Sequence, residues 1–471
     1  MRVLICIFDA LRPEFVTPEL MPNLSAFAAS GVQYTQSRAV FPTETRVNQS
    51  AVTTGCLPRK HGVVGNKMMA ADLLPERMVD TGVDAALVEA LAAGPVLQVP
   101  NMAERLHAEG KSFASLSAGT PGGGRLINHS AERIGSTRLA MNAPDQCWPQ
   151  DLFDRTVRKL GPLPEAKPPA PAWIDWAVDA YLEVIEPEVA PDAMLLWLCE
   201  PDETFHWHGI GGPEARGIIS HVDRAFGRIL ARHRAAIEAG EMQIIAMSDH
   251  GQLTLTGGHL DLPARLAEAG FTCSRVGLGE ADCALALANG GGLWVRDPAV
   301  TVRIVEWLGT QDWCGPVFTR DGLGRSLPYA LLGLDHPRAP DIALVCKADD
   351  GLNEHGLAGL SAHDAPYPVG GGCHGGLSPW ELHNVLCLGG GAFRSGQRID
   401  APAGNIDILP TVMRLVGLPV PDDIDGRVLY EAFAEGGGAP DWSAFSETSS
   451  LAAVSGRRTA AGIYLDKAWR P

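Results

Sequence analysis

The sequence predicts an α/β protein with a mostly parallel central sheet sandwiched by helices. Short continuous apolar runs, such as residues 3–8, 193–199 and 242–247, are typical of strands that are buried on both faces. Segments with helical periodicity separate these runs, which is the alternation of a βαβ fold. Acidic or histidine residues follow several of the runs, at the edge where open α/β sheets carry their sites.

The order of the predicted elements follows from apolar periodicity and from Gly and Pro stops. We expect strands at 3–8, 112–116, 193–199, 242–247 and 385–388, and helices at 22–29, 47–54, 101–109, 173–185, 213–239 and 405–416. Between residues 119 and 171 the pattern weakens, and we expect the Pro-rich run P-L-P-E-A-K-P-P-A-P-A before Trp173 to be an extended connector. The run G-T-P-G-G-G at 119–124 lacks the G-x-G-x-x-G spacing, so we do not interpret it as a nucleotide loop.

Residues 251–371 are predicted to form an inserted α+β subdomain that caps the site. They contain a helical pattern at 262–270 and short strand patterns at 292–295, 317–319 and 342–346. The segments with chemical signals, S-D-H-G and G-C-H-G-G, lie on either side of this stretch. The catalytic core would therefore be discontinuous, formed by residues 1–250 and 372–471.

Composition narrows the class of partner. The 471-residue chain has 38 Lys+Arg against 55 Asp+Glu, a net charge of -17, which argues against binding a nucleic-acid polymer. A small phosphorylated substrate stays compatible with this charge, because bound divalent metals reverse its sign locally. The composition does not predict an oligomeric state.

Location is predicted from the apolar segments and the cysteines. No apolar stretch is long enough for a membrane span, and the N-terminal run fits a first strand better than a signal peptide. The ten cysteines are scattered without a C-x-x-C pair, which favours free thiols. We therefore expect a cytoplasmic protein with no membrane partner.

A hydroxyl residue, Thr45, stands at the start of the predicted helix at 47–54. Unpaired backbone N–H groups and the helix dipole make such a position favourable for an anion, although a threonine there is often only an N-cap. Thr43 is a rival. Cys56 lies in C-L-P-R-K, which departs from the sulfatase pattern C-x-P-x-R and follows the helix instead of starting it, so we reject a sulfatase.

Three carboxylates and three imidazoles follow predicted strands: Asp9, Asp202, His206, Asp249, His250 and His374. The D-x-x-x-H spacing of Asp202 and His206, across a strand-to-loop junction, can direct both side chains to one metal ion. Such a donor set suits two divalent ions, most favourably Zn with Mn as an alternative. Two metals would let a threonine hydroxyl attack phosphorus, and the amide of Asn66 could donate to a phosphoryl oxygen.

Along the chain, the motifs occur in the order Asp, T-x-x-N, T-G-x-x-P-x-x-H-G, N, P-D-x-x-x-H, S-D-H-G and H-G. This order resembles that of the alkaline phosphatase superfamily. Within it, the closest resemblance is to the type I phosphodiesterase/nucleotide pyrophosphatase family, from residue 3 to about residue 431. The resemblance implies an alkaline-phosphatase-like core and hydrolysis of phosphodiesters or nucleotide pyrophosphates through a phosphoryl-threonine intermediate. The predicted cap resembles no family that we can name.

The resemblance also implies a role for each matching residue. One metal ion would be held by Asp202, His206 and His374. The other would be held by Asp9, Asp249 and His250, with Thr45 as the nucleophile bridging toward it. Asn66 would be the donor to a phosphoryl oxygen, and the T-x-x-N register favours Thr45 over Thr43.

Two cations depart from the family pattern. Arg46 follows the nucleophile, where the pyrophosphatases commonly carry an aromatic or small residue, and Lys67 follows Asn66. They could bind a carboxylate or a second phosphate of the substrate, or they could face solvent or pair with Glu44 and Asp72.

Three readings of function therefore stay open. The first is a phosphodiesterase or nucleotide pyrophosphatase, and the second is a phosphonoacetate-hydrolase-like or phosphomonoester hydrolase. The third, a catalytically silent protein that binds phosphoryl ligands, is disfavoured because the nucleophile and all six ligand positions are present.

Overall fold

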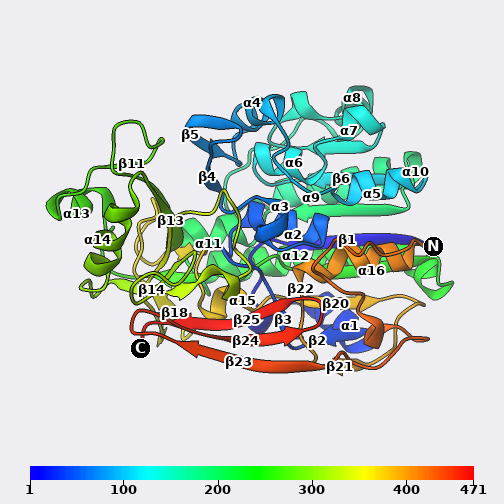
Figure 1. The fold of residues 1–471 in the computed structure, drawn as a ribbon. Coiled ribbons are helices and arrows are strands. Elements are labelled where there is room, and N and C mark those ends of the chain that lie inside the picture. Colours follow the sequence, from blue (N-terminus) through cyan, green and yellow to red (C-terminus); the bar gives the residue numbers. More distant parts are fainter.

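The computed structural model describes all 471 residues and is built on a central eight-stranded sheet, drawn in Figure 1. The strand order is β21-β2-β20-β9-β1-β8-β6-β7. The strands are β1 (Arg2–Phe8), β2 (Val32–Tyr34), β6 (Phe113–Ser117), β7 (Thr137–Ala140), β8 (Ala193–Leu198), β9 (Met242–Met247), β20 (Leu386–Gly389) and β21 (Gln397–Ile399). All neighbours pair in parallel except β20, which is antiparallel to β9 and β2. The predicted fold class is confirmed.

The two faces of β1 contribute to different hydrophobic clusters. Leu4, Cys6 and Phe8 pack with α1 (Pro22–Ser30), α9 (Pro171–Ala180) and α12 (Pro213–Glu238). Val3, Ile5 and Ile7 pack with α5 (Met102–Ala108), α16 (Ile408–Leu415) and Val52 of α2 (Thr45–Thr54). This alternation along one fully buried strand is the reason for its continuous apolar run. No helix, including the long α12, combines the length and the hydrophobicity that a membrane span needs.

The segment between 119 and 171, where the sequence pattern is weak, contains regular structure before its Pro-rich connector. This segment contains α6 (Pro121–Ile127), β7 and α8 (Gln150–Leu160). The Thr120 hydroxyl caps α6 by accepting a hydrogen bond from the Gly123 amide (3.3 Å). A Cβ atom on Gly122 would lie 2.2 Å from the Thr81 carbonyl oxygen. Close packing therefore requires the glycines that weaken the helical signal in the sequence.

A six-stranded sheet lies within the predicted insertion. Its order is β11-β12-β13-β16-β14-β15, with β11 (Cys273–Ser274), β12 (Cys283–Leu287), β13 (Gly290–Val295), β14 (Cys314–Thr319), β15 (Leu327–Pro328) and β16 (Ile342–Cys346). With α13 (Leu262–Glu268) and α14 (Pro298–Leu308) it encloses its own apolar cluster. Phe318 and Tyr329 join a second cluster together with Val47 of α2. The division into two domains stays a prediction.

A smaller sheet connects the two ends of this segment to the strands that lead to the site. Its order is β17-β18-β10-β19, with β10 (Leu253–Leu255), β17 (Ala348–Leu352), β18 (Ala358–Ser361) and β19 (Gly372–Cys373). β10 is antiparallel to β19, so the S-D-H-G and G-C-H-G-G segments are held side by side.

The C-terminal residues form a three-stranded antiparallel sheet that the sequence did not predict, drawn in red in Figure 1. It consists of β23 (Trp442–Thr448), β24 (Ala453–Thr459) and β25 (Ile463–Trp469). Tyr464 fixes this sheet to the core, because its hydroxyl donates to the buried carboxylate of Asp407 (3.0 Å). The remaining regular elements are short: α3 (Pro58–His61), α4 (Asp84–Ala93), α7 (Ala131–Ile134), α10 (Glu186–Glu188), α11 (Asp202–His208), α15 (Pro379–Leu382), β3 (Ser37–Arg38), β4 (Lys67–Ala70), β5 (Leu74–Asp80) and β22 (Ala403–Gly404).

Candidate active site

Three adjacent strands deliver acidic residues to one edge of the central sheet. Asp9 follows β1, Asp202 lies shortly after β8, and Asp249 follows β9. Because β8, β1 and β9 are neighbours with parallel register, their carboxyl ends lie together. The structure therefore places the three predicted carboxylates in one buried site.

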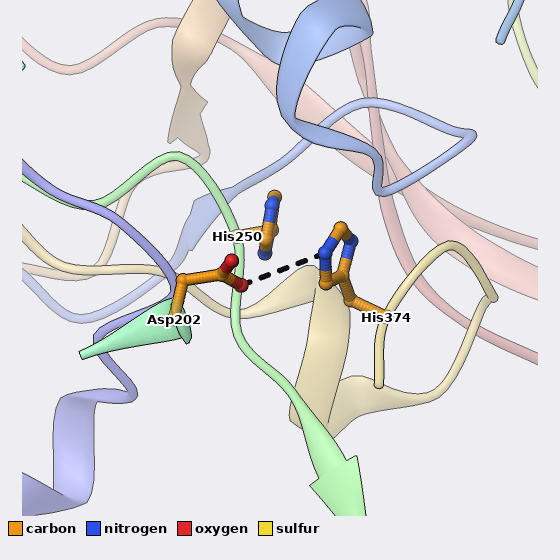
Figure 2. A group of neighbouring side chains, drawn as sticks. All are labelled: Asp202, His250 and His374. Atoms are coloured by element: carbon orange, nitrogen blue, oxygen red, sulfur yellow. Dashed lines mark ion pairs between the residues drawn. The ribbon is translucent and has the colours of Figure 1, made fainter. Parts of the chain in front are cut away.

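Asp202 and His206 lie on a helix, not across a strand-to-loop junction as predicted. They belong to α11, where a spacing of four residues puts both side chains on one face, with 3.2 Å between Asp202 Oδ2 and His206 Nε2. α11 starts at Asp202, shortly after β8, and its first turn is stabilised by the buried carboxylate of Glu200, which accepts a hydrogen bond from the Thr204 amide (3.1 Å). His374 enters from β19, and its Nε2 lies 3.5 Å from Asp202 Oδ1; Figure 2 shows the two rings of His250 and His374 beside this carboxylate.

A second group of side chains is formed by Asp9, Asp249 and His250. His250 Nε2 lies 3.1 Å from Asp249 Oδ2 and 3.7 Å from Asp9 Oδ1. Both carboxylate oxygens are buried without a hydrogen-bond partner. Two clusters have ligand atoms that all lie within 4.8 Å of one another: Asp9, Asp249 and His250, and Asp202, His250 and His374. His250 belongs to both, so the two predicted ligand sets are contiguous.

The histidines are oriented by backbone carbonyl groups. Nδ1 of His206 lies 2.8 Å from the Gly372 oxygen, Nδ1 of His374 lies 2.8 Å from the Thr43 oxygen, and Nδ1 of His250 lies 3.0 Å from the Gly251 oxygen. When Nδ1–H donates to a carbonyl, the lone pair of a neutral imidazole is on Nε2. All three Nε2 atoms are the ones that approach the carboxylates. This arrangement is typical of metal-ligating histidines.

Electrostatics in the site favour a bound cation. Burial and the neighbouring Asp249 raise the pKa of Asp9 well above its usual range. Burial and the neighbouring His250 lower the pKa of His374 well below its usual range, so this imidazole is neutral. The neighbouring carboxylates raise the pKa of His206 and of His250 despite burial. Buried carboxylate oxygens without a partner are unfavourable alone and become favourable around a divalent ion. The residues therefore fit the two metal ions that the family resemblance implies.

Thr45 is the first residue of α2, and Glu44, not Thr45, occupies the N-cap position. The Thr45 hydroxyl lies 3.2 Å from His250 Nε2, at the junction of the two ligand clusters. The Thr43 hydroxyl instead donates to the Gly376 carbonyl (2.9 Å) and accepts from the Gly375 amide (3.0 Å). Of the two candidate nucleophiles, only Thr45 has its hydroxyl directed to the ligands.

Asn66 lies beside the start of α2. Its side-chain oxygen accepts a hydrogen bond from the Arg46 amide (3.1 Å), and its own backbone amide donates to the buried Glu44 carboxylate. Since the amide oxygen is engaged with the helix, the side-chain NH₂ is the group left to donate to a ligand.

The two predicted cations differ in their surroundings. Lys67 is exposed on β4, and its ammonium pairs with Asp80 of β5 at 3.0 Å. Arg46 forms no ion pair, and its Nε is buried without a partner. Neither cation pairs with Glu44 or Asp72, since Asp72 is bound by Arg338.

Sequence reasoning missed the side chains that hold the ligands in place. Trp197 Nε1 donates to Asp9 Oδ2 (2.9 Å), and the Ala10 amide donates to Asp249 Oδ1 (3.1 Å). The Asn405 side chain donates to the Asp249 carbonyl (2.6 Å) and to Asn48 Oδ1 (2.7 Å). No motif joins these residues, because their partners lie far away in the chain.

Comparisons with known proteins identify the family of this chain. The family model for type I phosphodiesterase/nucleotide pyrophosphatase matches residues 3–270. A venom phosphodiesterase of Crotalus durissus collilineatus is 24% identical over 248 residues, covering 52% of this chain and 25% of that protein. This chain thus spans about a quarter of that relative's length. Human steryl-sulfatase is 55% identical over only 39 residues, which is 8% of this chain.

Among solved structures, murine ectonucleotide pyrophosphatase/phosphodiesterase 5 aligns with a TM-score of 0.61 and 16% identity. The alignment covers 89% of this chain and 96% of the murine one, and a second structure holds an inactive threonine-to-alanine variant in complex with AMP. At this identity the likeness shows a shared fold, the alkaline-phosphatase-like fold with additional sheets. Since the family model covers more than half of the chain, the protein belongs to the type I phosphodiesterase/nucleotide pyrophosphatase family.

Proposed function

We propose that this protein is a two-metal hydrolase of phosphodiesters or nucleotide pyrophosphates, with Thr45 as its nucleophile. The observation that carries the proposal is the position of the Thr45 hydroxyl, 3.2 Å from the His250 nitrogen that two buried ligand clusters share. A threonine at a helix start, next to unpaired carboxylates, is suited to attack on a metal-neutralised phosphoryl group.

The ligand assignment follows the family resemblance and agrees with the two clusters except that His206, 3.2 Å from Asp202 Oδ2, takes the place of the shared His250 in one set. Asp202, His206 and His374 would hold one ion, and Asp9, Asp249 and His250 would hold the other, with Zn preferred and Mn as the alternative. When bound, the two ions lower the pKa of the nucleophile hydroxyl and neutralise charge on the phosphoryl group.

The other steps depend on residues of this chain. Thr45 attacks phosphorus in line, the bond to the leaving oxygen breaks, and a phosphoryl-threonine intermediate results. The side-chain NH₂ of Asn66 donates to a non-bridging oxygen as charge develops there. The N–H groups at the start of α2 favour the same negative charge. Water then attacks phosphorus, the bond from Thr45 Oγ1 to phosphorus breaks, the phosphoryl product leaves with the oxygen from water, and the threonine hydroxyl regains a proton.

The substrate class is supported by the family and by the relatives. The matched venom protein is a phosphodiesterase, and the murine fold relative binds AMP as a variant. A small phosphorylated molecule therefore suits this chain better than a nucleic-acid polymer, whose binding the net charge of -17 disfavours.

The test compares Thr45→Ala with Thr53→Ala in metal-loaded protein. Thr53 lies on the same helix, is equally enclosed, and its hydroxyl donates to the Gln49 carbonyl (2.8 Å) away from the ligands. We expect Thr45→Ala to lower hydrolysis of bis(4-nitrophenyl) phosphate by roughly a thousandfold or more, with metal content unchanged, whereas Thr53→Ala stays active. Full activity of Thr45→Ala would refute the nucleophile assignment. Metal-free protein with full activity would refute the two-metal site.

A further inference from the structure

Arg46 carries a guanidinium group without a protein partner at the start of α2. It forms no ion pair with any carboxylate, and its Nε is buried and unpaired. A buried donor without an acceptor is unfavourable, and native structures usually satisfy such a group with protein, water or a ligand. We therefore expect a ligand to supply the acceptor that Arg46 Nε lacks in the protein.

Asp80, an acidic side chain near Arg46, is already occupied. Asp80 Oδ2 lies 3.0 Å from the Lys67 ammonium, and Asp80 Oδ1 accepts a hydrogen bond from the Gly82 amide (3.0 Å). A Cβ atom on Gly82 would lie 3.5 Å from Arg46 Nη2, so the guanidinium rests against this glycine. Lys67 is therefore the cation that pairs with Asp80, and Arg46 has no ion-pair partner.

The position of Arg46 links it to the reaction centre. It directly follows Thr45, and its amide is held by Asn66, the proposed donor to the phosphoryl group. Its guanidinium rests against Gly82, and the preceding residue, Thr81, donates its hydroxyl to the Asn66 carbonyl (2.8 Å). The guanidinium therefore lies beside the segment that holds Asn66, and Arg46 belongs to neither ligand cluster.

We propose that Arg46 binds a second anionic group of the substrate, next to the attacked phosphorus. This inference rests on the proposed function and narrows its substrate class to phosphorus compounds that carry an additional phosphate or carboxylate. The planar fork of a guanidinium binds either anion with two parallel hydrogen bonds, which suits both a nucleoside polyphosphate and a phosphonate with a carboxylate. Plain diesters lack such a group.

The test measures kcat/KM of the metal-loaded full chain for three substrates: ATP, phosphonoacetate and bis(4-nitrophenyl) phosphate. Arg46→Gln is compared with Arg46→Lys and with the neighbouring Lys67→Gln. We expect Arg46→Gln to lower kcat/KM for one anion-bearing substrate, relative to the aryl diester, by roughly tenfold or more, because a charge-assisted hydrogen bond is lost. Arg46→Lys should restore part of this ratio, and Lys67→Gln should change it much less.

The substrate for which Arg46→Gln lowers kcat/KM shows whether the subsite binds a phosphate or a carboxylate. A loss for ATP indicates a second phosphate, and a loss for phosphonoacetate indicates a carboxylate; either supports the subsite. The subsite would be overturned if the ratio of kcat/KM for the anion-bearing substrate to kcat/KM for the aryl diester stayed within twofold of the wild-type ratio in Arg46→Gln, for both ATP and phosphonoacetate.

A binding measurement keeps this outcome distinct from failure of the proposed function. In Thr45→Ala protein, titration calorimetry with pyrophosphate and with orthophosphate measures affinity without turnover. We expect Arg46→Gln in this background to weaken pyrophosphate more than orthophosphate by roughly tenfold. If Arg46→Gln weakens pyrophosphate and orthophosphate binding equally, the subsite is overturned, even when no substrate is hydrolysed. If the protein with Thr45 intact does not hydrolyse the diester but Arg46→Gln still weakens pyrophosphate more than orthophosphate, the proposed reaction is wrong and the subsite is supported.

Discussion

Asn405 connects α2, which carries the proposed nucleophile, to the loop that carries the proposed metal ligands Asp249 and His250, and replacing it tests whether this connection positions the site. Its side chain is fully buried. The NH₂ group donates to Asn48 Oδ1 on α2 (2.7 Å) and to the Asp249 carbonyl (2.6 Å), while Oδ1 accepts from Asn384 Nδ2 (2.7 Å). Asn405→Ala removes all three hydrogen bonds at once.

The magnitude follows from the groups that lose partners. The Asp249 carbonyl keeps one long contact to Asn384 Nδ2 (3.5 Å), and that Nδ2 keeps the Ser248 carbonyl (2.8 Å). Asn48 Oδ1 keeps the Val40 amide (2.9 Å). An unsatisfied buried polar group costs about 1–3 kcal/mol, and each of these groups loses one hydrogen-bond partner but keeps another. We therefore expect the free energy of unfolding to fall by about 2–4 kcal/mol. The backbone that carries Asp249 and His250 should also shift, which weakens metal binding.

Urea unfolding and zinc titration of the same variants measure both effects. Asn128→Ala is the matched control, because Asn128 is equally buried and donates to the Thr137 carbonyl (3.0 Å) at the far edge of the sheet. We expect Asn128→Ala to lower stability with unchanged zinc affinity, and Asn405→Ala to lower both, the affinity by roughly tenfold. A loss below about 0.5 kcal/mol for Asn405→Ala, or unchanged zinc affinity, would refute the reasoning.

Three further predictions concern the same machinery. Trp197→Phe removes the donor to Asp9 Oδ2 while keeping an aromatic ring, and should lower zinc affinity by roughly tenfold or more in a calorimetric titration; unchanged affinity would contradict the role given to this bond. Burial raises the pKa of Asp407 to about 6, so the folded state binds its proton more tightly than the unfolded state and stability from this group should fall as pH rises from about 4 to 6. Urea unfolding at several pH values should show this decline in wild-type protein and a smaller one in Asp407→Asn; parallel curves would exclude it. Removal of divalent ions with a chelator should abolish hydrolysis and lower the thermal midpoint, because the Asp9 and Asp249 oxygens then lack a partner; an unchanged midpoint with full metal release would contradict this.

The fold class and the grouping of three carboxylates could be predicted because both depend on local pattern. The β1, β8 and β9 strands are buried on both faces, which leaves continuous apolar runs in the sequence, and parallel strands bring their carboxyl ends to one edge. Asp9, Asp202 and Asp249 therefore had to be close together. The C-terminal sheet and α6 were not predictable in this way, since exposed strands and glycine-rich helices carry weak periodicity.

Only the tertiary structure decided which polar side chains pair. Lys67 and Arg46 look alike in the sequence, yet the β4–β5 hairpin places Lys67 opposite Asp80 and leaves Arg46 without a partner. The bond between Asn405 and Asn48 joins residues 357 positions apart. The physical reason is that a hydrogen bond or ion pair depends on angles and distances of a few ångströms, and packing between distant segments sets these without leaving a trace in local sequence.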